Sequence, residues 1–214
     1  QSRVLEESLI RAGVPYRVYG GQRFYDRLEI RNALAYLRLV MNRNDDAAME
    51  RVINVPTRGI GAKAVEKIRI TARDQGCSLW DAVTQLIGAG VSARGASALQ
   101  GFVDLVNQLD EQTKGLPLHE QTDHVIQASG LLKFHKEEKG EKGQTRVENL
   151  EELVSATRAF EPENDDELTP LQSFLSSAAL DAGEQQADEY EDSVQMMTLH
   201  SAKGLEVPLV FLVG

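Results

Sequence analysis

Hydrophobic and polar positions at the start of the chain follow first a helical and then an extended pattern. Apolar residues at helical spacing predict a helix over 2–12, and alternation over 15–19 predicts a short strand. Gly20 and Gly21 predict a turn, and a strong apolar stripe predicts a second helix over 26–42. The order helix, strand, turn, helix is typical of an α/β unit.

From residue 45 or 46 to about residue 180 the apolar spacing predicts helices only. Thr145, with Glu148 three residues later, is the expected start of one of these helices. The predicted helices are 46–53, 62–75, 78–88, 94–113, 118–129, 131–138, 146–160 and 169–180.

After the helical segment, two short apolar runs, 193–199 and 209–213, predict strands. Short strands that are apolar throughout are typical of a parallel sheet buried on both faces. The sequence therefore predicts a mainly α chain in which 42–192 forms a helical inserted subdomain. Segments 1–41 and 193–214 are then pieces of one α/β domain that flank it.

The charge is distributed unevenly along the chain, whose net charge is −10. Residues 1–73 hold 14 Lys or Arg and 8 Asp or Glu, whereas residues 74–214 hold 9 Lys or Arg and 25 Asp or Glu. Segment 159–192 holds 11 acidic residues and no Lys or Arg. A basic first third can present a positive face to phosphate, while the acidic segment should avoid DNA. A solvated basic surface without a ligand would show the same count.

Two glycine-rich segments are candidates for gripping phosphate with backbone N–H groups. Thr57 to Gly61 (TRGIG) directly precedes the predicted helix at 62, and the N-terminus of a helix attracts anions. Residues 139–146 (KGEKGQTR) form a second glycine–lysine segment before a predicted helix. Such turns grip a phosphate without reading a base. Plain interhelical turns have the same pattern.

The segment 198–206 follows a predicted strand directly and concentrates chemically active side chains. Ligands of open α/β sheets bind at the carboxyl ends of the strands. Hydroxyl and imidazole groups can donate to phosphate, lysine can neutralise it, and a carboxylate can accept from sugar hydroxyls. A polar loop with a solvated lysine remains the alternative. The residues are Thr198, His200, Ser201, Lys203, Gly204 and Glu206.

Four segments together resemble the UvrD/PcrA/Rep-type superfamily 1 DNA helicases. Residues 194–214 (VQMMTLHSAKGLEVPLVFLVG) are similar to helicase motif V, except at Val207, where an aromatic residue is more usual. Residues 16–39 resemble motif IVa, and 54–61 (NVPTRGIG) resemble the Gly-Ile-Gly loop of the inserted 2B subdomain. Residues 139–153 resemble another 2B signature. The resemblance implies that 42–192 is 2B and that the flanks belong to the RecA-like motor domain 2A.

The resemblance also implies roles for individual residues. Phe24 is expected in the core rather than as a stacking platform for bases. The implied nucleotide-binding residues are Lys203, Gly204 and Glu206, and those for single-stranded DNA are Thr198, His200, Ser201, Gly20, Gly21 and Arg23. The residues that the resemblance implies for binding duplex DNA are Thr57, Arg58, Gly59, Ile60, Gly61, Lys63, Lys142, Gly143, Thr145 and Arg146.

The resemblance implies that the chain is a fragment of an ATP-dependent 3′-to-5′ DNA helicase that takes part in DNA repair. The implied location is the cytoplasm. ATP, Mg²⁺ and repair proteins belong to the intact parent. No stretch of the chain matches the Gly-x-x-x-x-Gly-Lys-Ser/Thr phosphate loop, so we expect no catalytic residue, no stable cofactor and no ATP hydrolysis in the fragment. Neither a metal site with zinc spacing nor a membrane span is predicted. A free-standing duplex-binding module and a protein-interaction or regulatory domain remain alternatives.

Overall fold

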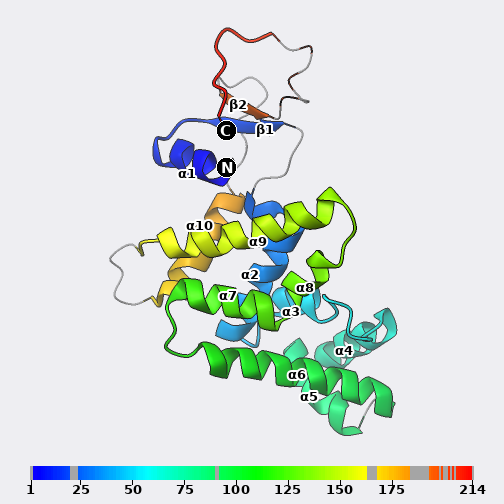
Figure 1. Cartoon of the computed structure of the whole chain (residues 1–214). Coiled ribbons are helices and arrows are strands. Elements are labelled where there is room, and N and C mark those ends of the chain that lie inside the picture. Colours follow the sequence, from blue (N-terminus) through cyan, green and yellow to red (C-terminus); the bar gives the residue numbers. More distant parts are fainter. Residues whose placement is uncertain are drawn as a thin grey trace. The chain divides into compact units, whose positions relative to one another are not determined.

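The fold is mainly helical. The computed structural model describes residues 2–19, 24–89, 92–162, 168–183, 193–197, 199, 202, 204 and 206–213. These residues form ten α-helices, one short 3-10 turn and two strands (Figure 1). The chain divides into two compact units, one made of Gln1–Arg27 with Ala178–Gly214 and the other of Leu28–Ser177.

The first unit joins the two ends of the chain through a parallel pair of strands. Strand β1 (Tyr16–Tyr19) pairs with β2 (Val194–Met197) so that the first residues and the last residues of the two strands face each other. Helix α1 (Ser2–Arg11) precedes β1, and the 3-10 turn η1 (Phe24–Asp26) follows it. The expected parallel pairing of the two flanks is confirmed.

Two expectations for this unit have different outcomes. Phe24 is 1% exposed and packs edge-to-face on Tyr25, with ring centroids 5.1 Å apart, which confirms its core position. The strand expected at 209–213 is wrong, because Leu209 to Val213 has no regular structure and its side chains are 61–80% exposed. An apolar run becomes a strand only beside a hydrogen-bonding neighbour, and the described part of this unit pairs only β1 with β2.

The second unit is built from helices around a central one, α2 (Leu28–Met41). Four other helices, α3, α6, α7 and α9, pack against α2, and nine of its fourteen residues are buried. The predicted boundary at residue 42 differs from the division of the chain, which places all of α2 in this unit. The remaining helices are α3 (Asp46–Val52), α4 (Ala62–Gln75), α5 (Leu79–Ala89), α6 (Ala93–Thr113), α7 (Leu118–Ala128), α8 (Leu131–Lys136), α9 (Glu141–Ala159) and α10 (Pro170–Gly183), whose last residues belong to the first unit.

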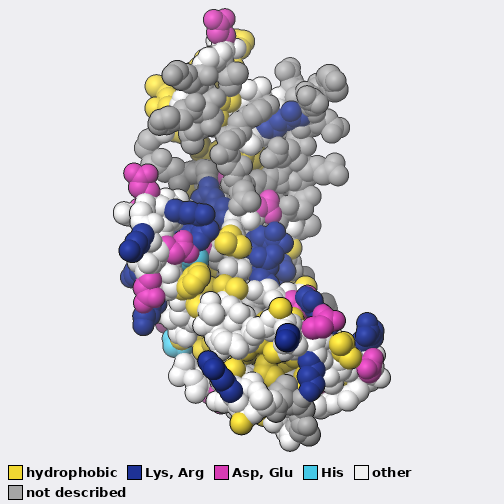
Figure 2. Space-filling view, turned by 90° about the vertical axis from the view of Figure 1, so that its right-hand side faces the viewer, with side chains coloured by type: hydrophobic (Ala, Val, Ile, Leu, Met, Phe, Trp, Pro, Cys, Tyr) yellow, Lys and Arg dark blue, Asp and Glu magenta, His cyan; other side chains and the backbone are white. Residues whose placement is uncertain are grey.

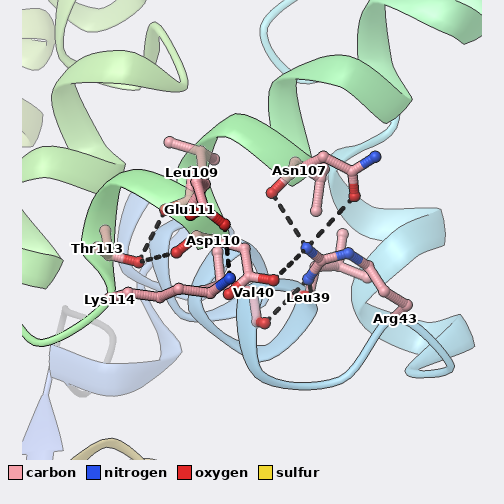
Figure 3. Close-up of polar contacts among 10 residues, drawn as sticks. Leu39, Val40, Arg43, Asn107, Leu109, Asp110, Glu111, Thr113 and Lys114 are labelled. Carbon is pink, nitrogen blue, oxygen red and sulfur yellow. Dashed lines mark hydrogen bonds and ion pairs between the residues drawn. The ribbon is translucent and has the colours of Figure 1, made fainter.

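Arg43 ties the end of α2 to α6. Its guanidinium donates to the carbonyl oxygens of Leu39 and Val40, which have no helical partner beyond the end of α2. The other side of the guanidinium forms an ion pair with Asp110 on α6 at 3.0 Å (Figure 3). Its carbon also lies 5.3 Å from the ring centre of Trp80. Arg43 therefore has a structural role, and its charge is occupied within the unit.

Candidate nucleic-acid interface

The loop between α3 and α4 is shaped by the side chain of Asn54. Its Oδ1 atom accepts hydrogen bonds from the backbone N–H groups of Arg58 at 2.8 Å and of Ile60 at 3.3 Å. Gly59 lies between them with φ of +78°, a left-handed conformation that favours glycine. Ile60 is 2% exposed and anchors the loop in the core. The loop is therefore held in one conformation from its inner side.

The outer side of the same loop leads into the N-terminus of α4. Thr57, Gly59, Gly61 and Lys63 are exposed, and Gly61 caps α4 without a side-chain hydrogen bond. Among the residues that the structure describes, no acceptor contacts the backbone N–H groups of Gly61, Ala62 or Lys63. Unpaired N–H groups at the positive end of a helix favour a bound anion. The sequence-predicted loop thus presents donors for one phosphate, with the Lys63 ammonium beside them.

The two glycines of the loop do not have the same role. Gly61 has φ of −81° and ψ of 172°, an extended conformation that any residue adopts. Only Gly59 is in the left-handed region. A Cβ atom at either position would meet nothing within 4 Å, so any cost of a substitution at Gly59 comes from its backbone conformation.

Arg58 points into the fold. Its guanidinium donates to the carbonyl oxygens of Ser129 at 2.8 Å, Pro56 at 2.9 Å and Val52 at 3.3 Å. The same group lies over the ring of Tyr36, 5.6 Å from its centre. A guanidinium committed to three carbonyls is not available to a phosphate in this arrangement. These contacts favour a role for Arg58 in positioning the loop, and its expected contact with DNA stays a prediction.

Tyr36 completes this buried arrangement beneath the loop. Its hydroxyl lies 2.7 Å from the carbonyl oxygen of Val55 and 3.3 Å from that of Val52. Burial raises the pKa of Tyr36 to about 12, and the nearby Arg58 charge opposes this rise only partly. The neutral phenol is therefore the form that the fold accommodates.

The second predicted loop is shorter than the sequence suggests. Helix α9 begins at Glu141, with Gly140 before it at φ of +85°, so Thr145 does not start the helix as expected. Gly143 is buried inside the first turns of α9, where a Cβ atom would lie 2.5 Å from the carbonyl oxygen of Glu138. Gly143 is therefore required for the close approach of the residues after α8 to α9. Its expected contact with duplex DNA stays a prediction.

Arg146 is also occupied within the fold. It forms an ion pair with Glu138 at 2.6 Å and lies 3.6 Å from the buried carboxylate of Glu29 on α2. The Thr145 hydroxyl donates to the carbonyl oxygen of Glu141. Of the four residues predicted here for duplex DNA, only Lys142 has an exposed charged group that the described contacts leave unpaired.

The predicted motif V segment starts where two paired strands end. Tyr19 and Met197 are partners at the carboxyl ends of β1 and β2, so the segments that continue from them start at the same edge of the sheet. Gly204 is exposed with φ of +90°, and Glu206 is exposed. The other residues predicted here lie outside the described residues: Gly20, Gly21, Arg23, Thr198, His200, Ser201 and Lys203.

Asn54 positions the candidate loop, and sequence analysis does not single it out. Its signal is an Asn at the start of a Pro- and Gly-containing turn, where its side chain commonly accepts from nearby backbone N–H groups. No three His, Cys, Asp or Glu side chains within the described ranges are placed to hold a metal ion. None of the described helices is long and apolar enough to cross a membrane.

Comparison with known proteins agrees with the resemblance of the four motifs. DNA helicase II of Escherichia coli is 59% identical over 216 residues, and the PcrA ATP-dependent DNA helicase of Bacillus subtilis is 42% identical over 220 residues. Each alignment covers 100% of this chain but 30% of the relative, so the chain spans about a third of their length. The family model of the UvrD-like helicase C-terminal domain matches residues 1–214. The chain therefore belongs to the UvrD-like helicase C-terminal domain family.

Proposed function

We propose that this chain is the part of an ATP-dependent DNA helicase that holds duplex DNA through an inserted helical subdomain. In this proposal Leu28–Ser177 corresponds to the 2B subdomain, and the paired strands belong to the second motor domain. The similarity to DNA helicase II and to the ATP-dependent DNA helicase PcrA supports the enzyme class. Repair partners and a cytoplasmic location stay predictions.

The observation that carries the proposal is the loop from Thr57 to Lys63. Its inner side is fixed by Asn54 and Arg58, while its outer side offers unpaired N–H groups at the head of α4. Backbone donors recognise phosphate without reading a base, which suits a protein that moves along DNA of any sequence. A fixed loop also loses little conformational entropy on binding.

The first unit supports a motor role in a longer protein. The segments that continue from Tyr19 and Met197 start at one sheet edge, where α/β domains bind their ligands. The exposed Glu206 carboxylate fits the hydroxyls of a nucleotide ribose, and ATP would supply the free energy for movement. Mg²⁺ binds together with a phosphate-cradling loop, a sequence this chain does not contain. The exposed apolar run Leu209 to Val213 is a surface that further strands and helices of a motor domain would bury.

Salt titration of DNA binding tests the loop. Lys63→Gln should lower the slope of log affinity against log salt by about one unit on duplex DNA, because one phosphate contact is lost. The matched control is Lys67→Gln, which removes an equally exposed charge one turn further along α4. Gly59→Ala should weaken duplex binding about tenfold, the value of one charge-assisted hydrogen bond.

Gly76→Ala is the control for Gly59→Ala. Gly76 ends α4 with φ of +62° and also has open space around its Cβ position, so both variants place an alanine in the left-handed region without a steric clash. If the loop binds duplex DNA, only the change at Gly59 affects affinity, and binding to single strands changes little. Equal duplex affinity in the two glycine variants would show that the loop is only a structural turn.

A further inference from the structure

A polar cluster joins the end of α8 to α9 and α2. Both carboxylate oxygens of Glu138, just after α8, accept from Arg146 on α9, at 2.6 and 2.7 Å, and one of them lies 2.8 Å from Nδ1 of His135. The Arg146 guanidinium also lies 3.6 Å from Glu29 on α2, whose carboxylate accepts from Asn149 at 2.6 Å. These five residues form the Arg146 clamp.

The clamp is held together by charge and by close packing. Burial acts to raise the pKa of Glu138, but its hydrogen bonds with His135 and Arg146 and the Arg146 charge together lower this pKa below its usual value. Glu138 is therefore ionised at neutral pH. The close approach of the chain also needs Gly143, where a Cβ atom would lie 2.8 Å from the carbonyl oxygen of His135. The end of α8 is thus fixed against α9.

The other end of α8 holds the loop that carries the proposed function. The carbonyl oxygen of Ser129 accepts from the Arg58 guanidinium at 2.8 Å, and its Oγ atom lies 3.5 Å from the N–H of Leu131, the first residue of α8. Gly130 lies against Pro56, because a Cβ atom on this glycine would be 3.7 Å from the proline Cγ. The residues before α8 therefore set the position of the segment that leads into the loop.

Helix α8 connects these two ends as a short rigid body. Its six residues span about 9 Å at a rise of 1.5 Å per residue. The helix packs on both α7 and α9, and Leu131 and His135 at its two ends are fully buried. Closely packed elements shift as units rather than deform. A shift of the clamped end therefore moves Ser129, which accepts from Arg58.

We propose that Glu138 and Arg146 are positioning residues for duplex binding, because the clamp fixes α8 and α8 presents Ser129 to Arg58. This inference rests on the proposed function. A loop that is already held in its binding conformation loses less conformational entropy when it binds. This role requires no contact between Arg146 and phosphate, since its guanidinium is shared between two carboxylates.

The opposite charges of the clamp distinguish positioning from electrostatic attraction. Figure 2 shows basic and acidic side chains on the face it presents, so the loss of any one charge changes the field that a duplex meets. By attraction alone, Arg146→Gln weakens duplex binding and Glu138→Gln strengthens it. By positioning, both changes weaken duplex binding, because each breaks the same ion pair.

Duplex affinity is measured for both single variants and the double variant of the full chain, well below their thermal midpoints. Each single change should lower the affinity about three- to tenfold, and the double variant should lose little more. The salt slope should stay within about 0.3 units of wild type, because no phosphate contact is lost. The matched controls are Glu111→Gln and Lys114→Gln, which break an exposed ion pair on α6 and should change affinity less than about twofold.

Two conservative variants keep the charge and test the geometry alone. Arg146→Lys cannot serve two carboxylates with a planar fork, and Glu138→Asp shortens the side chain by one methylene group. Electrostatic attraction predicts wild-type duplex affinity in both variants. Positioning predicts a loss of about two- to fivefold in each, with little change on single strands.

Amide hydrogen exchange of the free chain separates positioning from a general loss of stability. The N–H groups of Arg58 and Ile60 are held by Asn54, and all the clamp variants should speed their exchange about fivefold through local opening. The amides of the buried residues Phe102 and Val106 on α6 report global unfolding. A merely structural role would speed exchange at those amides while leaving the loop amides at their wild-type rates.

Each outcome decides between the two proposals. Weaker duplex binding in every clamp variant, with an unchanged slope and faster exchange at the loop amides, supports the positioning role. Stronger binding in Glu138→Gln, a slope lower by about one unit in Arg146→Gln, or wild-type loop exchange in all variants overturns it and leaves the loop proposal intact. A wild-type chain with no affinity for duplex contradicts the proposed function itself.

Discussion

Replacing Arg58 by Ala separates the role that the sequence suggests from the role that the structure shows. A surface arginine that contacts phosphate can be removed with little loss of stability but with a lower salt slope. The structural arginine seen here donates to the carbonyl oxygens of Val52, Pro56 and Ser129. Its loss leaves these acceptors without the donor and removes its contact with the ring of Tyr36. A phosphate contact therefore predicts unchanged stability and a lower salt slope, whereas the structural role predicts lower stability and an unchanged slope.

The size of the effect follows from the contacts. A hydrogen bond from a charged donor contributes about 1.5–3 kcal/mol, and the half-buried position of Arg58 reduces the sum over three such bonds. We expect Arg58→Ala to lower the free energy of unfolding by about 2–4 kcal/mol. For a chain of this length that corresponds to a fall in the thermal midpoint of about 5–15 °C. The salt slope of duplex binding should stay within about 0.3 units of wild type, because no phosphate contact is removed.

Thermal unfolding and salt titration of the same samples provide the assay. Arg58→Lys is the informative companion, because it keeps the charge but cannot serve three carbonyls with a planar fork. It should lose most of the stability that Arg58→Ala loses. Wild-type stability in Arg58→Ala together with a slope lower by about one unit would refute the structural role and restore the direct phosphate contact.

Further predictions concern stability and catalysis. Tyr36 binds its proton more tightly in the folded state, with a pKa of about 12, than at its ordinary value of 10.0. This contribution is fully present below pH 10 and is lost as the pH rises towards 12, so alkaline unfolding should show a loss of about 2–3 kcal/mol that Tyr36→Phe removes. Gly143→Ala should cost about 1–3 kcal/mol in chemical denaturation, because its Cβ would meet the carbonyl oxygen of Glu138. Gly101→Ala, at an exposed position of α6, should be neutral or stabilising. The 214-residue chain should show no DNA-stimulated ATP hydrolysis in a phosphate-release assay, and steady turnover by the pure chain would contradict this.

The helices were predictable where the local sequence alone decides their ends. Helix α4 begins and ends where the spacing predicts, because Gly61 and Gly76 mark its limits. Thr145 and Glu148 have the spacing of a capping box, and this spacing predicts a start of α9 that lies five residues after its actual start at Glu141. In the fold the helix starts after Gly140, whose positive φ ends the preceding segment. The local sequence therefore offers two helix starts, one after Gly140 and one after Thr145, and the fold uses the first.

The candidate site was predictable in its position but not in the direction of its side chains. The glycine spacing located the loop before α4, and its exposed outer side agrees with that prediction. The direction of Arg58 depends on Ser129, which is 71 residues away along the chain. Likewise, the partners of Arg146 include Glu29 on α2. Local patterns carry no information on such distant partners, so the sequence alone cannot tell an arginine that binds phosphate from one that positions the loop.

Amide hydrogen exchange of the wild-type chain with and without duplex DNA tests the central claim most directly. We expect duplex to slow exchange of the N–H groups from Gly61 to Lys63, because they donate to phosphate, and we expect this slowing to weaken as salt is raised. The amides around Gly76 at the other end of α4 should exchange equally fast in both states. Exchange at Gly61 to Lys63 that stays unchanged while duplex is bound would contradict the proposed phosphate contact.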